Sequence, residues 1–249
     1  MNSNKEQLLI GIHAVSSALK SAAGDITWLR VLTNSRNKRL REVESRAHGS
    51  GIKVIHCDAA ELDRLSGQRR HQGVIAGFKG GNIMAEGQLE AALAAIEGMP
   101  LLLVLDEVQD PHNLGACLRT AEAAGVDLVV ISKDHSCGIT PVVRRAASGA
   151  AETLPIVQAT NLARVLRALK EHGIWLAGTS DAASGSLYDT DLAGPLALVM
   201  GSEGSGLRRL TAELCDYLVS IPMAGTVESL NVSVATGVCL FEINRQRRI

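Results

Sequence analysis

Aromatic residues are scarce in this sequence, and their scarcity excludes one way of holding nucleic acid. Two Trp, two Tyr and two Phe make up 2% of the 249 residues. Domains that bind single strands, such as RRM and OB folds, stack successive bases on aromatic rings. Six aromatic residues are too few for such a platform, so any RNA ligand would have to be held mainly by charge and shape.

Cysteine pairs, metal-ligand spacings and long apolar runs are also missing. The five cysteines are scattered and form no CxxC pair, which predicts reduced core thiols and no zinc or other metal site. No apolar run approaches the roughly 20 residues of a membrane helix, and the N-terminus lacks the layout of a signal peptide. We therefore expect a soluble, cytoplasmic globular protein without a membrane partner.

The net charge of −1 conceals an uneven distribution along the chain. Residues 1–80 hold 13 Lys and Arg against 7 Asp and Glu, a net of +6; the totals of 25 and 26 leave 12 against 19, a net of −7, for residues 81–249. Such a basic segment favours a polyanionic partner, although a solvated helix face would give the same pattern. The candidates for phosphate contact are Arg36, Lys38, Arg39, Arg69 and Arg70.

Two α/β domains are expected from the hydrophobic pattern. In residues 1–79 we expect helices at 12–22 and 35–48 and after Asp58, with strands at 27–32, 52–56 and 74–78. Residues 80–87 include the glycines of a linker, although an Ala-rich helix is expected to open at residue 86 and run to 97. In residues 88–249, strands at 101–105, 127–132, 154–157, 174–179, 196–200 and 217–221 alternate with helices. That alternation predicts a mostly parallel sheet covered on both faces.

The first group of candidate site residues follows the buried strand at 101–105. DPHNLGACLRTA (residues 110–121) contains Asn113 and Arg119 around a helix expected to start near Leu114. Asn113 would then cap the helix, and Arg119 would lie one turn in; simple capping and ion pairing are the structural alternatives. His112 has no nucleophile beside it, so a hydrolytic triad is not favoured.

Two more groups follow later strands. VMGSEGSGL (residues 199–207) places Glu203 among three glycines, with neither the Lys of a P-loop nor the GxGxxG spacing, so ATP and NAD are not favoured. IPMAGTVESLNVSVATG (residues 221–237) places Ser229 and Asn231 at a helix start, where capping is again the alternative. All three groups lie at carboxyl ends of strands in one sheet, which predicts a single pocket lined by Asn113, Arg119, Glu203, Ser229 and Asn231.

In their order along the chain and in their residues, these three segments resemble the motifs of the SpoU/TrmH (SPOUT) family of RNA ribose 2′-O-methyltransferases. The similarity covers about residues 100–249. GIHAV (residues 11–15) and the basic first domain further resemble the substrate-binding domain of the family's 23S rRNA guanosine 2′-O-methyltransferases. The resemblance implies a parallel-sheet SPOUT domain with a deep trefoil knot, a homodimer, and a role in ribosome biogenesis.

The resemblance also assigns residues. It implies catalytic roles for Asn113, Arg119, Glu203, Ser229 and Asn231, and binding of S-adenosylmethionine (SAM) by Thr179, Met200, Gly201, Ile221, Met223, Leu230 and Val232. The implied reaction is methyl transfer to a guanosine 2′-hydroxyl in the peptidyl-transferase region of 23S rRNA. The alternatives are the same reaction on tRNA or another rRNA nucleotide, or a non-catalytic RNA-binding assembly factor.

Overall fold

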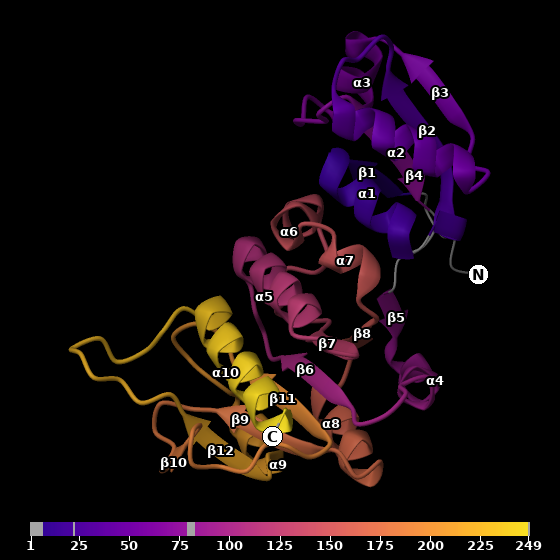
Figure 1. The fold of residues 1–249 in the computed structure, drawn as a ribbon. Helices are drawn as coiled ribbons and strands as arrows, with labels where there is room; N and C mark the ends of the chain where they lie inside the picture. Colours follow the sequence, from indigo (N-terminus) through magenta and orange to yellow (C-terminus); the bar gives the residue numbers. More distant parts are fainter. Residues whose placement is uncertain (1–6, 22, 79–82, 249) are drawn as a thin grey trace. The chain divides into compact units, whose positions relative to one another are not determined.

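The computed structural model describes residues 7–21, 23–78 and 83–248 and separates them into two compact units (Figure 1). The first unit holds the described residues up to Phe78 together with Ser148–Thr153, and the second holds Ile83–Ala147 and everything after Thr153. Part of the expected linker, residues 80–82, lies outside the described residues. The boundaries placed at 79 and 88 stay predictions.

The first unit is the expected small α/β domain, built on a four-stranded sheet of order β1-β4-β2-β3. Its elements are β1 (Gln7–Ile10), α1 (Ile12–Ser21), the 3₁₀ helix Ala23–Asp25, β2 (Ile26–Leu32), α2 (Lys38–Gly49), β3 (Val54–Cys57), α3 (Ala59–Ser66) and β4 (Val74–Phe78). Strand β1 was not expected; it pairs antiparallel with β4. One core cluster packs α1 and α2 against the sheet, and a smaller one packs α3 against the other face.

The second unit confirms the parallel sheet, with eight strands of order β10-β12-β9-β11-β6-β7-β8-β5, all parallel. The strands are β5 (Ile83–Ala85), β6 (Leu101–Leu105), β7 (Leu128–Ser132), β8 (Ile156–Ala159), β9 (Trp175–Thr179), β10 (Gly185–Ser186), β11 (Leu196–Met200) and β12 (Tyr217–Ser220). The helices are α4 (Leu89–Ala94) after a 3₁₀ turn (Glu86–Gln88), α5 (Pro111–Ala123), α6 (Pro141–Ala147), α8 (Leu162–Glu171), α9 (Arg209–Leu214) and α10 (Val232–Arg247); α7 (Ala150–Thr153) falls in the first unit.

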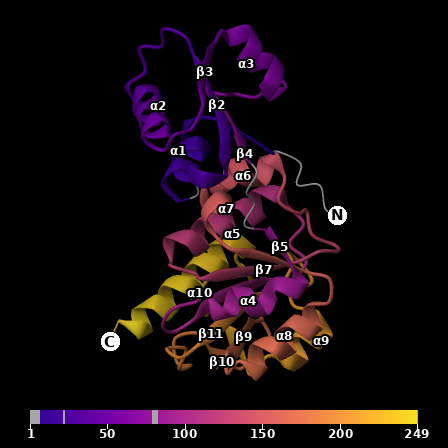
Figure 2. The same ribbon diagram turned by 90° about the vertical axis from the view of Figure 1, so that its right-hand side faces the viewer.

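Side chains of the buried strands alternate between two helical layers, as a pleated strand requires. Leu102 and Val104 of β6 lie in a fully buried cluster with side chains of α4 and α8. On the second unit's other helical layer, α5 packs alongside α10 and α6 (Figures 1 and 2). Within the part of the chain that the structure describes, no helix has both the length and the apolar character needed to cross a bilayer.

Strand order reverses at β6, and this reversal positions the site. From β6 the chain adds β7 and β8 on one side, then crosses to β9 and returns to β11 on the other. Open parallel sheets bind ligands outside the carboxyl ends of strands at such a point. The segments expected to carry the site follow β6, β11 and β12. The trefoil knot implied for the C-terminal segment stays a prediction.

Candidate active site

Helix α5 begins earlier than the sequence predicted, and this changes what Asn113 does. Asp110 is the N-cap: its Oδ1 accepts the backbone N–H groups of His112 and Asn113, each at 2.8 Å. Pro111 occupies the first helical position, where its fixed φ and missing N–H suit the helix. The expected start near Leu114 with Asn113 as cap is therefore wrong, and the Asn113 side chain is available for another partner.

That partner is Glu203, which lies 90 residues further along the chain. Asn113 Nδ2 donates a hydrogen bond to Glu203 Oε1. Asn231 Nδ2 donates to the same oxygen at 2.9 Å and to Asn113 Oδ1 at 3.0 Å. Asn231 also caps α10, because its Oδ1 accepts the backbone N–H of Ser233 at 2.9 Å. Three of the five expected catalytic residues thus form one hydrogen-bonded group.

The loop that presents Glu203 is closed on itself. The backbone N–H of Ser202 donates to Gly206 O at 3.1 Å, and the N–H of Gly206 donates to Ser202 O at 3.0 Å. The two stems of the loop approach so closely that a Cβ on Gly201 would lie 2.2 Å from the carbonyl carbon of Gly206. Gly201 is therefore required by the close approach of two backbone segments.

A cavity of about 480 Å³ opens beside this loop at the carboxyl ends of β9, β11 and β12. Its lining includes all seven residues expected to bind SAM: Thr179, Met200, Gly201, Ile221, Met223, Leu230 and Val232. Backbone N–H and C=O groups of residues 221–230 make no hydrogen bonds to other described residues. The cavity wall therefore offers both apolar side chains and free backbone groups to a ligand.

The remaining two candidates are placed differently from each other. Ser229 is exposed and lines the cavity together with Glu203. Arg119 is exposed on α5, does not line the cavity, and has no hydrogen bond or ion pair to another described residue. It lies eight residues after Pro111, so it is more than two turns into the helix, not one as expected, and about 9 Å along the axis from Asn113. Of the five expected catalytic residues, Glu203 and Ser229 line this cavity, and a single pocket lined by all five stays a prediction.

The basic residues of the first unit lie at the surface. Arg36, Lys38 and Arg39 are exposed around the start of α2, which Asn37 caps in place of the expected Ser35 by accepting the N–H of Arg39 at 3.0 Å. In the second cluster, Arg70 is exposed, whereas Arg69 is half-buried and its Nε donates to Ser66 O at 2.6 Å. At least the first cluster is available to a polyanion.

The thiols take no part in the site. All five cysteines are free; Cys57, Cys117 and Cys239 are buried as expected for core thiols, whereas Cys137 and Cys215 are half-buried. Burial raises the pKa of Cys117 to about 11 and the pKa values of Cys215 and Cys239 to about 12, so these groups stay protonated at neutral pH. Among the residues that the structure describes, no group of three His, Cys, Asp or Glu side chains could hold a metal ion.

Comparisons with known proteins identify relatives that match both units of the chain. Residues 100–241 match the SpoU rRNA Methylase family, and residues 8–83 match the domain described as RNA 2′-O ribose methyltransferase substrate binding. The chain is 52% identical to the 23S rRNA (guanosine-2′-O-)-methyltransferase RlmB of Ralstonia nicotianae, covering 99% of this chain and 98% of that one. It is 50% identical to the protein of the same name from Shewanella oneidensis, covering 98% and 99%.

Solved structures with the same architecture include one with a bound cofactor. The SpoU methyltransferase AviRb from Streptomyces viridochromogenes superposes with a TM-score of 0.80 at 27% identity, covering 98% of this chain and 90% of that one. The structure of AviRb in complex with the cofactor AdoMet gives 0.78 at 26% identity, covering 98% and 91%.

Proposed function

Because the chain belongs to the SpoU rRNA methylase family, we propose that it transfers a methyl group from SAM to the ribose 2′-hydroxyl of a guanosine in 23S rRNA. The observation that carries the proposal is the similarity to proteins named for this reaction. The similarity spans nearly the whole chain, and about half of the aligned residues are identical. The hydrogen-bonded side chains of Asn113, Glu203 and Asn231, beside a cavity large enough for a ligand, also support the proposal. The cytoplasm, where rRNA is made in bacteria, is the proposed location.

The cavity fits SAM on its own chemistry. Its volume falls within the roughly 300–1,000 Å³ of ligand pockets, and such pockets combine apolar walls with a few polar groups. Ile221, Leu230 and Val232 would hold the apolar parts, and the free backbone groups of residues 221–230 would hold the polar parts. When bound, SAM supplies a methyl group already activated by the sulfonium charge.

With an activated donor, the protein must position the ribose oxygen and help remove its proton. Asn113 and Asn231 hold Oε1 of Glu203, so the carboxylate has one fixed orientation beside the cavity. Ser229 lies on the same wall and is exposed to an incoming hydroxyl. We assign to Glu203 and Ser229 the positioning of the acceptor nucleotide.

Arg119 is assigned to orient the substrate, not to act as base. A guanidinium deprotonates only above about pH 12, whereas its planar fork binds phosphate through two hydrogen bonds. The substrate phosphate or Ser229 would then take part in proton transfer. Arg119→Lys keeps the charge and removes the fork, so it should lower the methylation rate; a rate close to that of the wild type would contradict bidentate orientation.

A homodimer is supported by the outer face of α10. Val234 and Phe241 lie seven residues apart on one helix face and are 52% and 53% exposed. Burial of this face against a second copy of the chain would remove both apolar side chains from water. Light scattering should give twice the chain mass for the wild type and a lower mass for Phe241→Glu; a monomeric wild type would contradict the homodimer.

The first unit is proposed as the RNA-binding domain. Its contacts with RNA phosphates can be measured from the salt dependence of the affinity for RNA. Changing Arg36, Lys38 and Arg39 together to Ala should weaken binding of 23S rRNA and flatten the slope of log K against log salt, because each phosphate contact contributes about 0.7–0.9 to that slope. The control removes three exposed cations of the same unit: Lys20, Lys53 and Arg64. Equal slopes for the two variants would remove α2 from the RNA site.

The function itself is tested by supplying labelled SAM with protein-free 23S rRNA, 16S rRNA and tRNA in separate reactions. We expect label on one guanosine of 23S rRNA. Label confined to tRNA would overturn the substrate, and no label on any RNA despite SAM binding would favour a non-catalytic assembly factor.

A further inference from the structure

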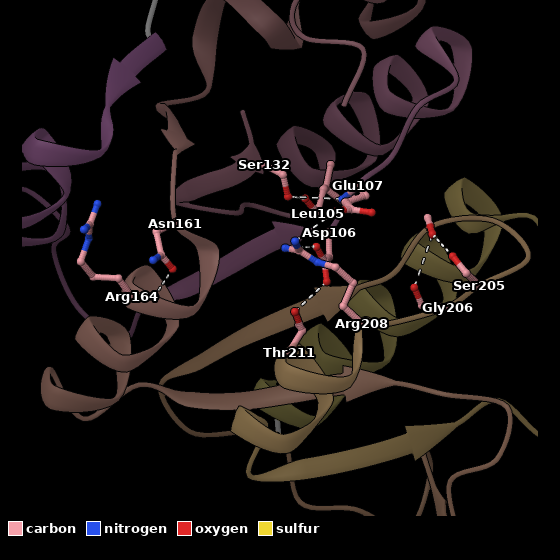
Figure 3. Close-up of polar contacts among 11 residues, drawn as sticks. Leu105, Asp106, Glu107, Ser132, Asn161, Arg164, Ser205, Gly206, Arg208 and Thr211 are labelled. Atoms are coloured by element: carbon pink, nitrogen blue, oxygen red, sulfur yellow. Dashed lines mark hydrogen bonds and ion pairs between the residues drawn. The ribbon is translucent and has the colours of Figure 1, made fainter. Parts of the chain in front are cut away.

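A fully buried carboxylate lies next to the loop formed by residues 201–207, which we call the Glu203 loop. This carboxylate is not one of the proposed catalytic residues. Asp106 directly follows β6, and its side chain is 0% exposed. Its carboxylate pairs with Arg208 Nη2 at 2.7 Å and accepts a hydrogen bond from the Thr211 hydroxyl at 2.7 Å (Figure 3). We call these three residues the Asp106 network.

The Asp106 network touches both ends of the loop that carries Glu203. The backbone N–H of Asp106 donates to Met200 O at 2.8 Å, which fixes the end that enters the loop. The carboxylate holds Arg208 and Thr211, which follow the loop's exit. Between these ends the loop is closed by the two Ser202–Gly206 hydrogen bonds. Asp106 is therefore the common anchor of a short, closed loop.

Arg208 is held too firmly to be a freely available cation. Its Nη1 pairs with Glu107 Oε1 at 3.0 Å while Nη2 pairs with Asp106. Partial burial acts to lower the pKa of Arg208, but its hydrogen bond to the Asp106 carboxylate and the charges of both acids raise the pKa overall. A buried carboxylate that lost this partner would be left uncompensated, which is costly. The loop's exit is thus tied to the end of β6.

We propose that Asp106, Arg208 and Thr211 are positioning residues for SAM binding, because they hold both ends of the Glu203 loop so that Met200 and Gly201 form the cavity wall. This inference rests on the proposed function, since it assumes that the cavity takes SAM. None of the three side chains needs to touch SAM or RNA. Their effect is to keep the loop in its binding conformation before the ligand arrives.

The test is the dissociation constant of SAM, measured by calorimetry without RNA. Arg208→Gln should raise this dissociation constant at least about tenfold, because the loop loses a hydrogen bond to a charged group. The matched control is Arg209→Gln, because Arg209 pairs with Glu213 at the surface and is 84% exposed. That control should bind SAM within twofold of the wild type. Circular dichroism melts show whether each variant is folded.

If loss of the Asp106–Arg208 ion pair unfolds the protein, substitutions of Thr211 provide a milder test. Thr211→Val keeps the shape and removes the donor to Asp106, so it should also weaken SAM binding, whereas Thr211→Ser keeps the hydroxyl and should restore it. Arg208→Gln and Thr211→Val both binding SAM like the wild type would overturn the inference. A raised KM for RNA with unchanged SAM affinity would overturn it in favour of a direct phosphate contact. A wild type that binds no SAM would overturn the proposed function itself.

Discussion

Replacing Gly201 with Ala tests whether the closed Glu203 loop is needed for cofactor binding. The new Cβ would lie 2.2 Å from the carbonyl carbon of Gly206, 2.3 Å from its oxygen and 2.4 Å from the nitrogen of Leu207. All three are backbone atoms, which cannot rotate aside as the end of a side chain can. Overpacking of this kind costs about 1–3 kcal/mol, and opening the loop would lose two backbone hydrogen bonds of about 1 kcal/mol each.

The two costs together come to about 3–5 kcal/mol, which corresponds to at least a roughly 150-fold rise in the dissociation constant of SAM. Calorimetry would measure the dissociation constant for the wild type, Gly201→Ala and Gly87→Ala. Gly87 is the control because it lies outside the cavity lining and a Cβ there meets no atom within 4 Å, so the affinity of Gly87→Ala for SAM should stay within twofold of the wild type. Folded Gly201→Ala protein that binds SAM as tightly as the wild type would show that the closed loop is not needed for SAM binding.

Three further predictions concern the site, the fold and pH. Asn113→Ala should lower the methylation rate about 100-fold at saturating SAM, because a fixed donor to Glu203 is lost, and a rate within fivefold of wild type would contradict this. Arg247→Ala should lower the free energy of unfolding in urea by about 2 kcal/mol, since its Nη2 donates to Pro100 O and Gly194 O at 2.8 and 2.7 Å, while exposed Arg248→Ala should change little. Burial raises the pKa of Cys117 to about 11 and of Cys239 to about 12. Unfolded thiols ionise near pH 8.5, so the unfolded chain binds fewer protons above that pH, and the free energy of unfolding should fall as pH rises from about 9 to 11; no fall would place these thiols in contact with water.

Strands that are buried on both faces could be predicted accurately. Leu101–Leu105, Val74–Phe78 and Leu196–Met200 were predicted with their observed bounds, since a short, continuous apolar run bounded by polar residues or glycine is typical of a strand covered on both faces. The short strands β1, β5 and β10 were missed. Each has two to four residues and exists through pairing at a sheet edge, which local sequence does not encode.

Helix starts were shifted wherever several capping residues follow one another. Asp110 caps α5 ahead of Asn113, and Asn37 caps α2 two residues after Ser35; each of these caps has an extended backbone and accepts an N–H of the first helical turn. The earlier start of α5 makes Asn113 helical as well, so Arg119 lies six helical residues, about 9 Å along the axis, beyond it. Arg119 is not among the residues that line the cavity.

The grouping of Asn113, Glu203 and Asn231 could be predicted, because parallel strands bring their carboxyl ends to one edge. The cavity lining was foreseen only through the family resemblance. The Asp106 network was not foreseen: Asp106 and Arg208 are 102 positions apart, and nothing in their local patterns indicates that they pair. The available signal was an acid placed directly after a buried strand.

Methylation of a ribose oxygen is distinguished from methylation of a base by alkaline hydrolysis of the labelled 23S rRNA. Alkali cleaves RNA through the free 2′-hydroxyl, so a 2′-O-methylated guanosine protects the phosphodiester that follows it. We predict that all label appears in a single dinucleotide that begins with guanosine. Label in a mononucleotide would show that a base is methylated, and would contradict the account.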